Sequence, residues 1–147
     1  MIFDASLLLS DQQAITASAA SANVIDLGAT GTPVGSSVPL TRDIGRGCKV
    51  ELSVAVTATF NNLTSLAVSI QTSPDNATWT TREQGEAVPL ANLVAGYQFK
   101  VPAEFEESTD TRYVRLFYTV VGTAPTTGKI NAGVVASRQT NNTYGGR

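Results

Sequence analysis

The chain has 147 residues, of which 42% are hydrophobic and only 15% are charged, and its formal net charge at pH 7 is -2. This length is sufficient for one domain whose core needs neither a disulfide nor a metal. The ten basic residues form no run, which excludes the electrostatic footprint of a nucleic-acid-binding protein, and the absence of His removes the commonest general base and metal ligand. A single cysteine, Cys48, allows neither an internal disulfide nor a zinc cluster, and we expect no enzyme activity, no metal and no cofactor.

The first ten residues are unusually apolar for a chain terminus. Their large apolar side chains are Ile2, Phe3, Leu7, Leu8 and Leu9. This stretch contains no Lys or Arg, so it lacks the basic start of a secretory signal, and three consecutive leucines are too few to cross a bilayer. Two interpretations of residues 1–10 stay open: an arm that binds a partner, or the first strand of the fold. In both cases we expect synthesis in the cytosol and no membrane association.

Residues 14–20 and 23–27 are weak strand candidates, and a loop follows them. Residues 28–37 hold three glycines, one proline and small polar side chains, a composition typical of a long flexible loop. Further glycines lead into the next strand, so we interpret Cys48 as structural or incidental and not as a reactive thiol.

The clearest strand signal covers residues 50–60. Apolar and polar side chains alternate there with a period of two, and only Ala55 breaks the pattern. This alternation predicts a strand with one face on the core and the other facing outward. A second alternating run, residues 66–71, follows a turn predicted at residues 61–62.

A tight turn is predicted at residues 74–76, where Pro is followed by Asp and Asn, and Trp79 then begins the return strand. Trp79 has two interpretations. A lone Trp after a hairpin turn usually caps the core, whereas a sugar-binding module places such a ring on its surface. We favour the core.

Three further strands are predicted at residues 97–101, 113–121 and 130–136. The middle one carries bulky side chains on both faces, so we expect it to be central and covered on both sides. Residues 122–128 have glycine at each end and Pro125 between, which predicts a hairpin loop joining the last two strands.

Together these elements predict an all-β fold, an antiparallel β-sandwich of the jelly-roll-like kind, in a single domain of residues 11–137. We expect residues 138–147 to form a flexible tail, in which Tyr144 is the only large side chain. The predicted core residues are Val50, Leu52, Val54, Val56, Leu66, Val68, Ile70, Leu116 and Val134.

The richest acidic stretch is Glu104, Glu106, Glu107 and Asp110. It follows Pro102 and precedes a strand, which favours a solvated loop. Without a base or a second organised acidic cluster, hydrolysis and metal chemistry have little to work with.

The low charge of the surface indicates association with other proteins. Thr, Ser, Asn and Ala stand where charges usually occur, and few lysines guard the edges of the predicted sheets. An unguarded edge can pair with a neighbouring chain. We therefore expect a homo-oligomer, and most simply a dimer.

The order of these features resembles a known family. Residues 1–16, followed by residues 23–28, are similar to the start of the capsid cement proteins of short-tailed bacteriophages, the type known from a Bordetella phage. The turn at residues 72–79 and residues 112–116 (RYVRL) with the following Gly122 fit the same family. The similarity runs over nearly the whole chain, and its motifs are structural and carry no chemistry.

The resemblance implies a jelly-roll fold, dimers near the two-fold axes of a phage capsid, and binding to the outside of the major capsid protein lattice. It supplies no catalytic residues. It predicts a virion protein that cements adjacent major capsid protein subunits and binds neither nucleic acid nor membrane. The alternative is a carbohydrate- or receptor-binding β-sandwich module, for which Trp79 is the feature to test.

The side chains best suited to partner contact lie at the two termini. A free terminus has no reason to display a dense apolar run to water unless something covers it. The predicted contact residues are Ile2, Phe3, Leu7, Leu8, Leu9 and Tyr144.

Overall fold

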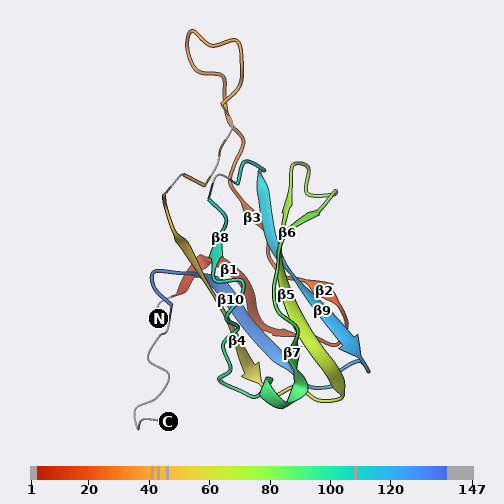
Figure 1. Ribbon diagram of the computed structural model, residues 1–147. Coiled ribbons are helices and arrows are strands. Elements are labelled where there is room, and N and C mark those ends of the chain that lie inside the picture. Colours follow the sequence, from red (N-terminus) through yellow and green to blue (C-terminus); the bar gives the residue numbers. More distant parts are fainter. Residues whose placement is uncertain (1–2, 41, 43, 46, 108, 139–147) are drawn as a thin grey trace.

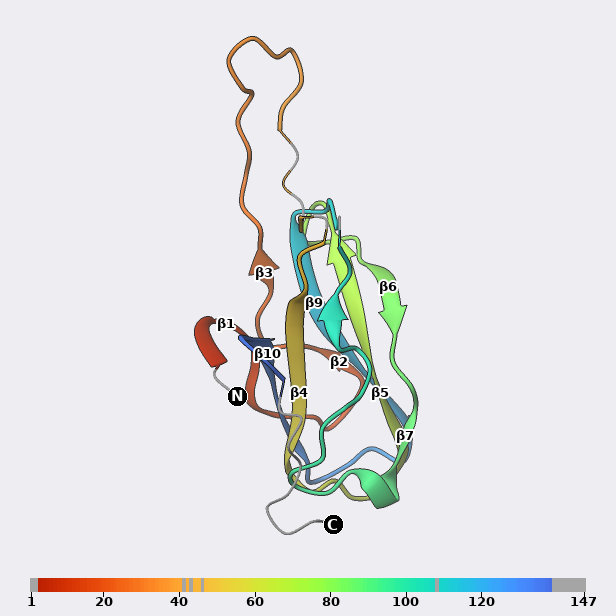
Figure 2. The ribbon, with the colours of Figure 1, turned by 60° about the vertical axis from the view of Figure 1, so that its left-hand side comes forward.

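The computed structural model describes residues 3–40, 42, 44–45, 47–107 and 109–138. Over these residues the chain forms two antiparallel β-sheets packed against each other, and a long loop projects from one end of them (Figures 1 and 2). The predicted all-β sandwich is confirmed. The only helical piece in the described part of the chain is one 3-10 turn, η1 (Leu90–Asn92).

The two sheets have the strand orders β1-β10-β4-β8 and β2-β9-β5-β6, with β3 beside β9 and β7 beside β5. The first sheet consists of β1 (Phe3–Ala14), β10 (Lys129–Val135), β4 (Val50–Ala58) and β8 (Glu104–Phe105). The second consists of β2 (Ala19–Ala20), β3 (Ile25–Asp26), β9 (Tyr113–Gly122), β5 (Leu63–Ser73), β6 (Thr80–Gln84) and β7 (Val88–Pro89).

The strand order is that of a jelly roll. Strands β2 and β3 both pair with β9 and act as one interrupted strand, and β6 and β7 do the same beside β5. Counted this way, the described residues form eight strands, and the chain changes sheet at every connection except the one between β5 and β6. This alternation is the double Greek key of a jelly roll.

The core lies between the sheets, where the alternating residues of β4, β5 and β9 face inward. Seven of the nine predicted core residues are at most 2% exposed: Leu52, Val54, Val56, Leu66, Val68, Ile70 and Leu116. Val50 and Val134 are only partly buried. Each lies at the end of its strand, beside an open cavity described below.

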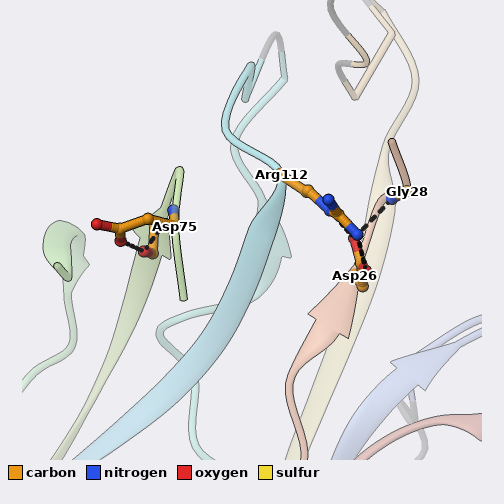
Figure 3. A network of polar contacts seen from close by, with 5 residues as sticks. Asp26, Gly28, Asp75 and Arg112 are labelled. Atoms are coloured by element: carbon orange, nitrogen blue, oxygen red, sulfur yellow. Dashed lines mark hydrogen bonds and ion pairs between the residues drawn. The ribbon is translucent and has the colours of Figure 1, made fainter. Parts of the chain in front are cut away.

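The predicted turn after β5 is confirmed, and Asp75 holds it (Figure 3). Its carboxylate accepts hydrogen bonds from the backbone N–H groups of Ala77 (2.9 Å) and Thr78 (2.7 Å) and from the hydroxyl of Ser73 (2.9 Å). These donors favour the charged form, so they hold the pKa of Asp75 well below its ordinary value. Asn76 adopts a positive φ of 59°, as a tight turn requires.

The predicted hairpin between residues 113–121 and 130–136 is wrong. Strands β9 and β10 lie in different sheets, so the loop that joins them crosses from one sheet to the other. The loop is held by Asn61, whose side-chain carbonyl accepts hydrogen bonds from the backbone N–H groups of Thr126 (2.8 Å) and Thr127 (3.0 Å). Glycine and proline indicate a change of chain direction, but they do not determine whether the flanking strands pair.

The strand predicted at residues 97–101 does not form. The segment runs beside β4, and the backbone N–H of Phe99 donates to the carbonyl of Val54 (3.0 Å), but only one isolated bridge is made, between Ala55 and Gln98. Phe99 is nevertheless fully buried. The alternation therefore predicted correctly that Phe99 faces the core, although the pairing of this segment with β4 is too short to form a strand.

Strand β9 is central in its sheet, as expected, but only one of its faces is covered. Val114, Leu116 and Tyr118 are at most 1% exposed on the inner face. The side chains of the outer face are partly exposed, and they are Tyr113, Arg115, Phe117 and Thr119. The prediction of two covered faces is wrong, because bulky side chains on the outer face pack on one another and not beneath a further layer.

The N-terminal segment is the first strand from Phe3 onward. Strand β1 pairs with β10, and three register shifts interrupt the pairing. Bulges of this kind make an edge strand a poor template for another chain. The other edges include β8, β2 and β3, each only two residues long. These edges lack lysines but are protected by their geometry, whereas β6, five residues long, is also an edge, so association through an edge stays a prediction.

Candidate functional site

The described residues contain no group of three or more His, Cys, Asp or Glu side chains that could hold a metal ion. No helix in the described part of the chain is long and apolar enough to cross a membrane.

The acidic stretch lies beside β6 and is only partly a loop. Glu104 belongs to β8, whereas Glu106 and Glu107 follow it and are exposed. Glu104 and Glu106 share a surface depression of about 310 Å³ with Arg82 and Glu83. Burial, together with the charges of Glu104 and Glu106, raises the pKa of Glu83. The carboxylates of Glu83, Glu104 and Glu106 repel one another in this depression. Arg82 is the only cation among the residues that line it.

The predicted contact residues of the N-terminus differ in how far the structure buries them. Leu9 is fully buried in the core, so it is unavailable to a partner and the prediction is corrected for this residue. Phe3, Leu7 and Leu8 are partly buried. Phe3 and Leu7 line a shallow groove together with Asp4, Val134, Val135 and Ala136. Ile2 and Tyr144 lie outside the described residues.

Trp79 neither caps the core nor stands free on the surface. The guanidinium of Arg115 lies 3.9 Å from the centre of its ring, on the outer face of the β2-β9-β5-β6 sheet. Arg115 also donates from Nε to the side-chain carbonyl of Gln71 (2.9 Å), which fixes the guanidinium in place. Phe117 continues the cluster, 5.9 Å from the same guanidinium. The prediction that Trp79 caps the core is wrong: its ring packs on the outside of the sheet, against an arginine, and is partly exposed there.

The most conspicuous surface feature is the projecting loop, which we call the arm and define as residues 28–40. Figures 1 and 2 show it extending away from the sandwich, in orange, between the end of β3 and the start of β4. Its tip is a turn in which the N–H of Ser36 donates to the carbonyl of Pro33 (3.0 Å), with Gly35 at a φ of 84°. A type II turn requires this positive φ at its third position, so glycine is suited to the site.

The arm carries apolar side chains into solvent. Val34 at the turn is fully exposed, and Val38 and Leu40 are 65% and 57% exposed. The arm contains no charged residue. Soluble proteins rarely present a neutral apolar projection without a surface that covers it.

An ion pair fixes the root of the arm to the second sheet (Figure 3). Arg112, just before β9, donates from Nε to Asp26 Oδ1 (2.7 Å) and from Nη2 to Asp26 Oδ2 (2.8 Å). The backbone N–H of Gly28 donates to the same carboxylate (2.8 Å). Chiefly through the Arg112 hydrogen bond, the pKa of Asp26 falls to about 2. The arm therefore leaves the sandwich from a fixed point.

A cavity opens between the sheets at the base of the arm, and we call it the mouth. Its volume is about 120 Å³. All eight lining residues are apolar: Leu7, Ile25, Leu27, Ile44, Val50, Phe105, Val114 and Val134. Ile25 and Leu27 lie on the chain that enters the arm, and Ile44 lies on the chain that returns from it.

Sequence reasoning identified the loop but not the arm or the mouth. The glycines of residues 28–37 predict a flexible loop. The sequence feature that indicates an apolar projection is the position of Val34, Val38 and Leu40 among glycines and prolines, outside any predicted core strand. The mouth has no sequence signal, because its eight residues come from six different strand regions and from the segment that precedes β4.

The chain matches a known protein family. A family model described as Bbp16 matches residues 9–134, which is most of the chain. No curated protein matches the chain.

Proposed function

The chain belongs to the Bbp16 family, a Bordetella phage protein family, and on this basis we propose that it is a structural virion protein that binds the outside of a phage capsid and cements adjacent major capsid protein subunits. The family match carries the proposal, because residues 9–134 take in nearly the whole sandwich from β1 to β10.

The architecture supports a role in which the protein transmits load and does not change shape. A cluster of buried hydrophobic residues fills the space between the two sheets, and β1 and β10 pair with each other. A close-packed interior of this kind has low compressibility. The surface is sparsely charged, which lowers the cost of burying it against another protein.

The proposed contact region for the major capsid protein is the exposed side of β1. Phe3, Leu7 and Leu8 are large, apolar and only partly buried there. Phe3 and Leu7 line a groove into which a side chain of a capsid subunit would fit. Ile2 and Tyr144 belong to the same proposal by their position near the chain ends, and Leu9 does not, because it is in the core.

Cementing requires only modest contacts if each copy bridges two subunits. Attachment to one subunit raises the effective concentration of the protein at the next, so two weak contacts act as a strong one. A stable interface buries about 1,000 Å² or more in total. The single groove at Phe3 is much smaller than that, so we expect additional contacts over neighbouring parts of the sandwich.

The test is co-sedimentation of the purified protein with empty shells of the major capsid protein from a phage that encodes this chain. We expect saturable binding and shells that withstand a higher temperature before they disassemble. Absence of binding at micromolar concentration would refute the proposal.

A matched pair of variants locates the contact. Phe3→Ser should weaken co-sedimentation by about tenfold or more, because one large apolar contact is lost from each attachment. Val94→Ser changes an exposed apolar side chain on the loop after η1 and should bind like the wild type. Equal binding of both variants would exclude Phe3 from the contact.

The carbohydrate-binding alternative gains no support from Trp79. A sugar-binding Trp stacks one open ring face on the sugar, and Arg115 already occupies one of the two faces of this ring at 3.9 Å, which leaves at most the opposite face. We therefore do not adopt that function.

A further inference from the structure

Two complementary features occur at the same end of the molecule. The arm projects from the end at which β3 finishes and β4 begins (Figures 1 and 2). The mouth is lined by Ile25 and Leu27 at the entry to the arm and by Ile44 on its return. A projecting apolar segment therefore stands directly beside an apolar recess.

The mouth has the size of one aliphatic side chain. An apolar cavity of about 150 Å³ stays dry and accepts a molecule as large as benzene. The mouth measures about 120 Å³, so it accepts a branched side chain such as valine or leucine. Its lining contains no polar residue that could bind a charged or hydrogen-bonding group.

The arm of the same chain does not supply that side chain. Val34 at its tip is fully exposed, and both views show the arm leading away from the sandwich. The ion pair between Asp26 and Arg112 fixes the root in this direction. The described part of the arm therefore leaves the mouth open to a side chain of another molecule.

We propose that two copies of this chain exchange arms, so that Val34 at the tip of each arm enters the mouth of the other copy. The arm contains no charge and the mouth contains no polar side chain, so the two surfaces match in chemistry. Both surfaces belong to one chain and lie at one end of it, which is the self-complementarity that a two-fold interface needs.

The length of the arm allows this arrangement. The seven residues from Gly28 to Val34 span at most about 23–25 Å when extended. Two copies that face each other end to end would then have their arms side by side in the gap between the two sandwiches. Val38 and Leu40, exposed on the returning half of the arm, would pack against the partner's arm there.

The first test is the oligomeric state of the purified protein, measured by sedimentation velocity over nanomolar to micromolar concentrations. We expect a dimer. Val34→Ser should raise the dissociation constant of the dimer by about a hundredfold. Each dimer loses two buried valine side chains, and the loss of each one should weaken dimerisation by about tenfold or more. Val121→Ser changes an equally apolar side chain, 49% exposed at the end of β9, and should leave the dimer intact.

The second test fills the mouth and leaves the arm unchanged. Val134→Phe places a larger apolar side chain in the cavity, so the fold keeps its packing while the mouth no longer admits Val34. We expect a monomer with an unchanged far-UV circular dichroism spectrum. A dimer that persists in both Val34→Ser and Val134→Phe would overturn the proposal, and so would a wild-type monomer at micromolar concentration.

A disulfide trap checks the pairing directly. Cys48 is free and exposed, so it is first replaced in Cys48→Ser. In that background, Val34→Cys with Val134→Cys should give a covalent dimer under mild oxidation, and Val121→Cys with Val134→Cys should not. Covalent dimer formation by the second pair alone would refute the arm exchange. These measurements contain no capsid, so their failure is separate from failure of the proposed function.

Discussion

The hydroxyl of Ser10 on β1 lies 2.7 Å from the hydroxyl of Tyr118 on β9, and both side chains are fully buried. This hydrogen bond joins the two sheets through the core. Ser10 also donates to the side-chain carbonyl of Gln13 (2.6 Å), and the same carbonyl accepts from the backbone N–H of Ala22 (2.8 Å). The side-chain amide nitrogen of Gln13 donates to the backbone carbonyl of Ala20 (2.8 Å). A buried polar network of this kind fixes the position of β1 relative to the second sheet.

Removal of the tyrosine hydroxyl should weaken the fold moderately. In Tyr118→Phe, Ser10 keeps its bond to Gln13, so we expect a loss of about 1–2 kcal/mol in the free energy of unfolding. Urea unfolding followed by circular dichroism measures it. In the control Tyr113→Phe, on the outer face of the same strand, the free energy should change by less than about 0.5 kcal/mol. An equal loss in both variants would contradict a special role for the buried pair.

Strand β1 should prove essential to the fold. Leu9→Ala empties a fully buried position and should cost about 2–5 kcal/mol, whereas Leu40→Ala on the arm should cost nothing measurable. Deletion of residues 1–9 should lower the melting temperature far more than either substitution, because most of β1 is lost with it. A truncated protein that melts like the wild type would show that β1 is dispensable.

The root of the arm should loosen in acid. Asp26 has a pKa of about 2 in the folded protein against an ordinary value of 3.8, so its bond to Arg112 stabilises the root fully above pH 4 and is lost as the pH falls towards 2. Hydrogen exchange of the Gly28 amide should become less protected over that range. A carboxyl titration by NMR that gives Asp26 a pKa near 3.8 would contradict the pairing.

Glu83 should have the opposite effect on stability. Burial and the charges of Glu104 and Glu106 raise its pKa in the folded state, so its ionisation destabilises the fold once the pH exceeds that raised value, and the cost vanishes below the ordinary pKa of 4.5. Glu83→Gln should therefore raise the melting temperature at pH 7 but not at pH 3. Glu86→Gln, at an exposed position nearby, serves as the control.

Trp79 is the only tryptophan, so intrinsic fluorescence reports on its ring alone. Arg115→Ala removes the guanidinium that covers it and should shift the emission to longer wavelength, with a loss of about 0.5–1 kcal/mol in stability. Arg82→Ala, on the neighbouring strand β6, should leave the emission unchanged. An unshifted spectrum in Arg115→Ala would show that the stacking does not persist in solution.

The sequence correctly predicted local features, such as which side chains of a strand face the core and where a tight turn lies. The period of two in β4 and β5 identified the inward face, and the Pro74-Asp75-Asn76 turn identified the hairpin of β5 and β6. It could not predict what depends on pairing between distant segments. Residues 123–128 have the composition of a hairpin loop, yet they join strands in different sheets.

The partner-contact residues were only partly predictable for the same reason. Leu7, Leu8 and Leu9 are consecutive, so they show no alternation, and the bulged pairing of β1 with β10 decides that Leu9 alone is fully buried. The direction of the arm depends on the contact between Asp26 and Arg112, which are 86 positions apart in the chain. Such a contact leaves no local pattern in the sequence.

The pairing of β1 with β10 has a consequence for synthesis of the protein on the ribosome. Phe3 is paired with Val135, so the first sheet cannot be completed until Val135 has been translated. At about 5–20 residues per second, β1 waits on the order of ten seconds for its partner strand. During that interval the edge of β4 that pairs with β10 has no partner strand. Folding that depends on such distant contacts is slow, and the nascent chain must stay soluble until its last strand arrives.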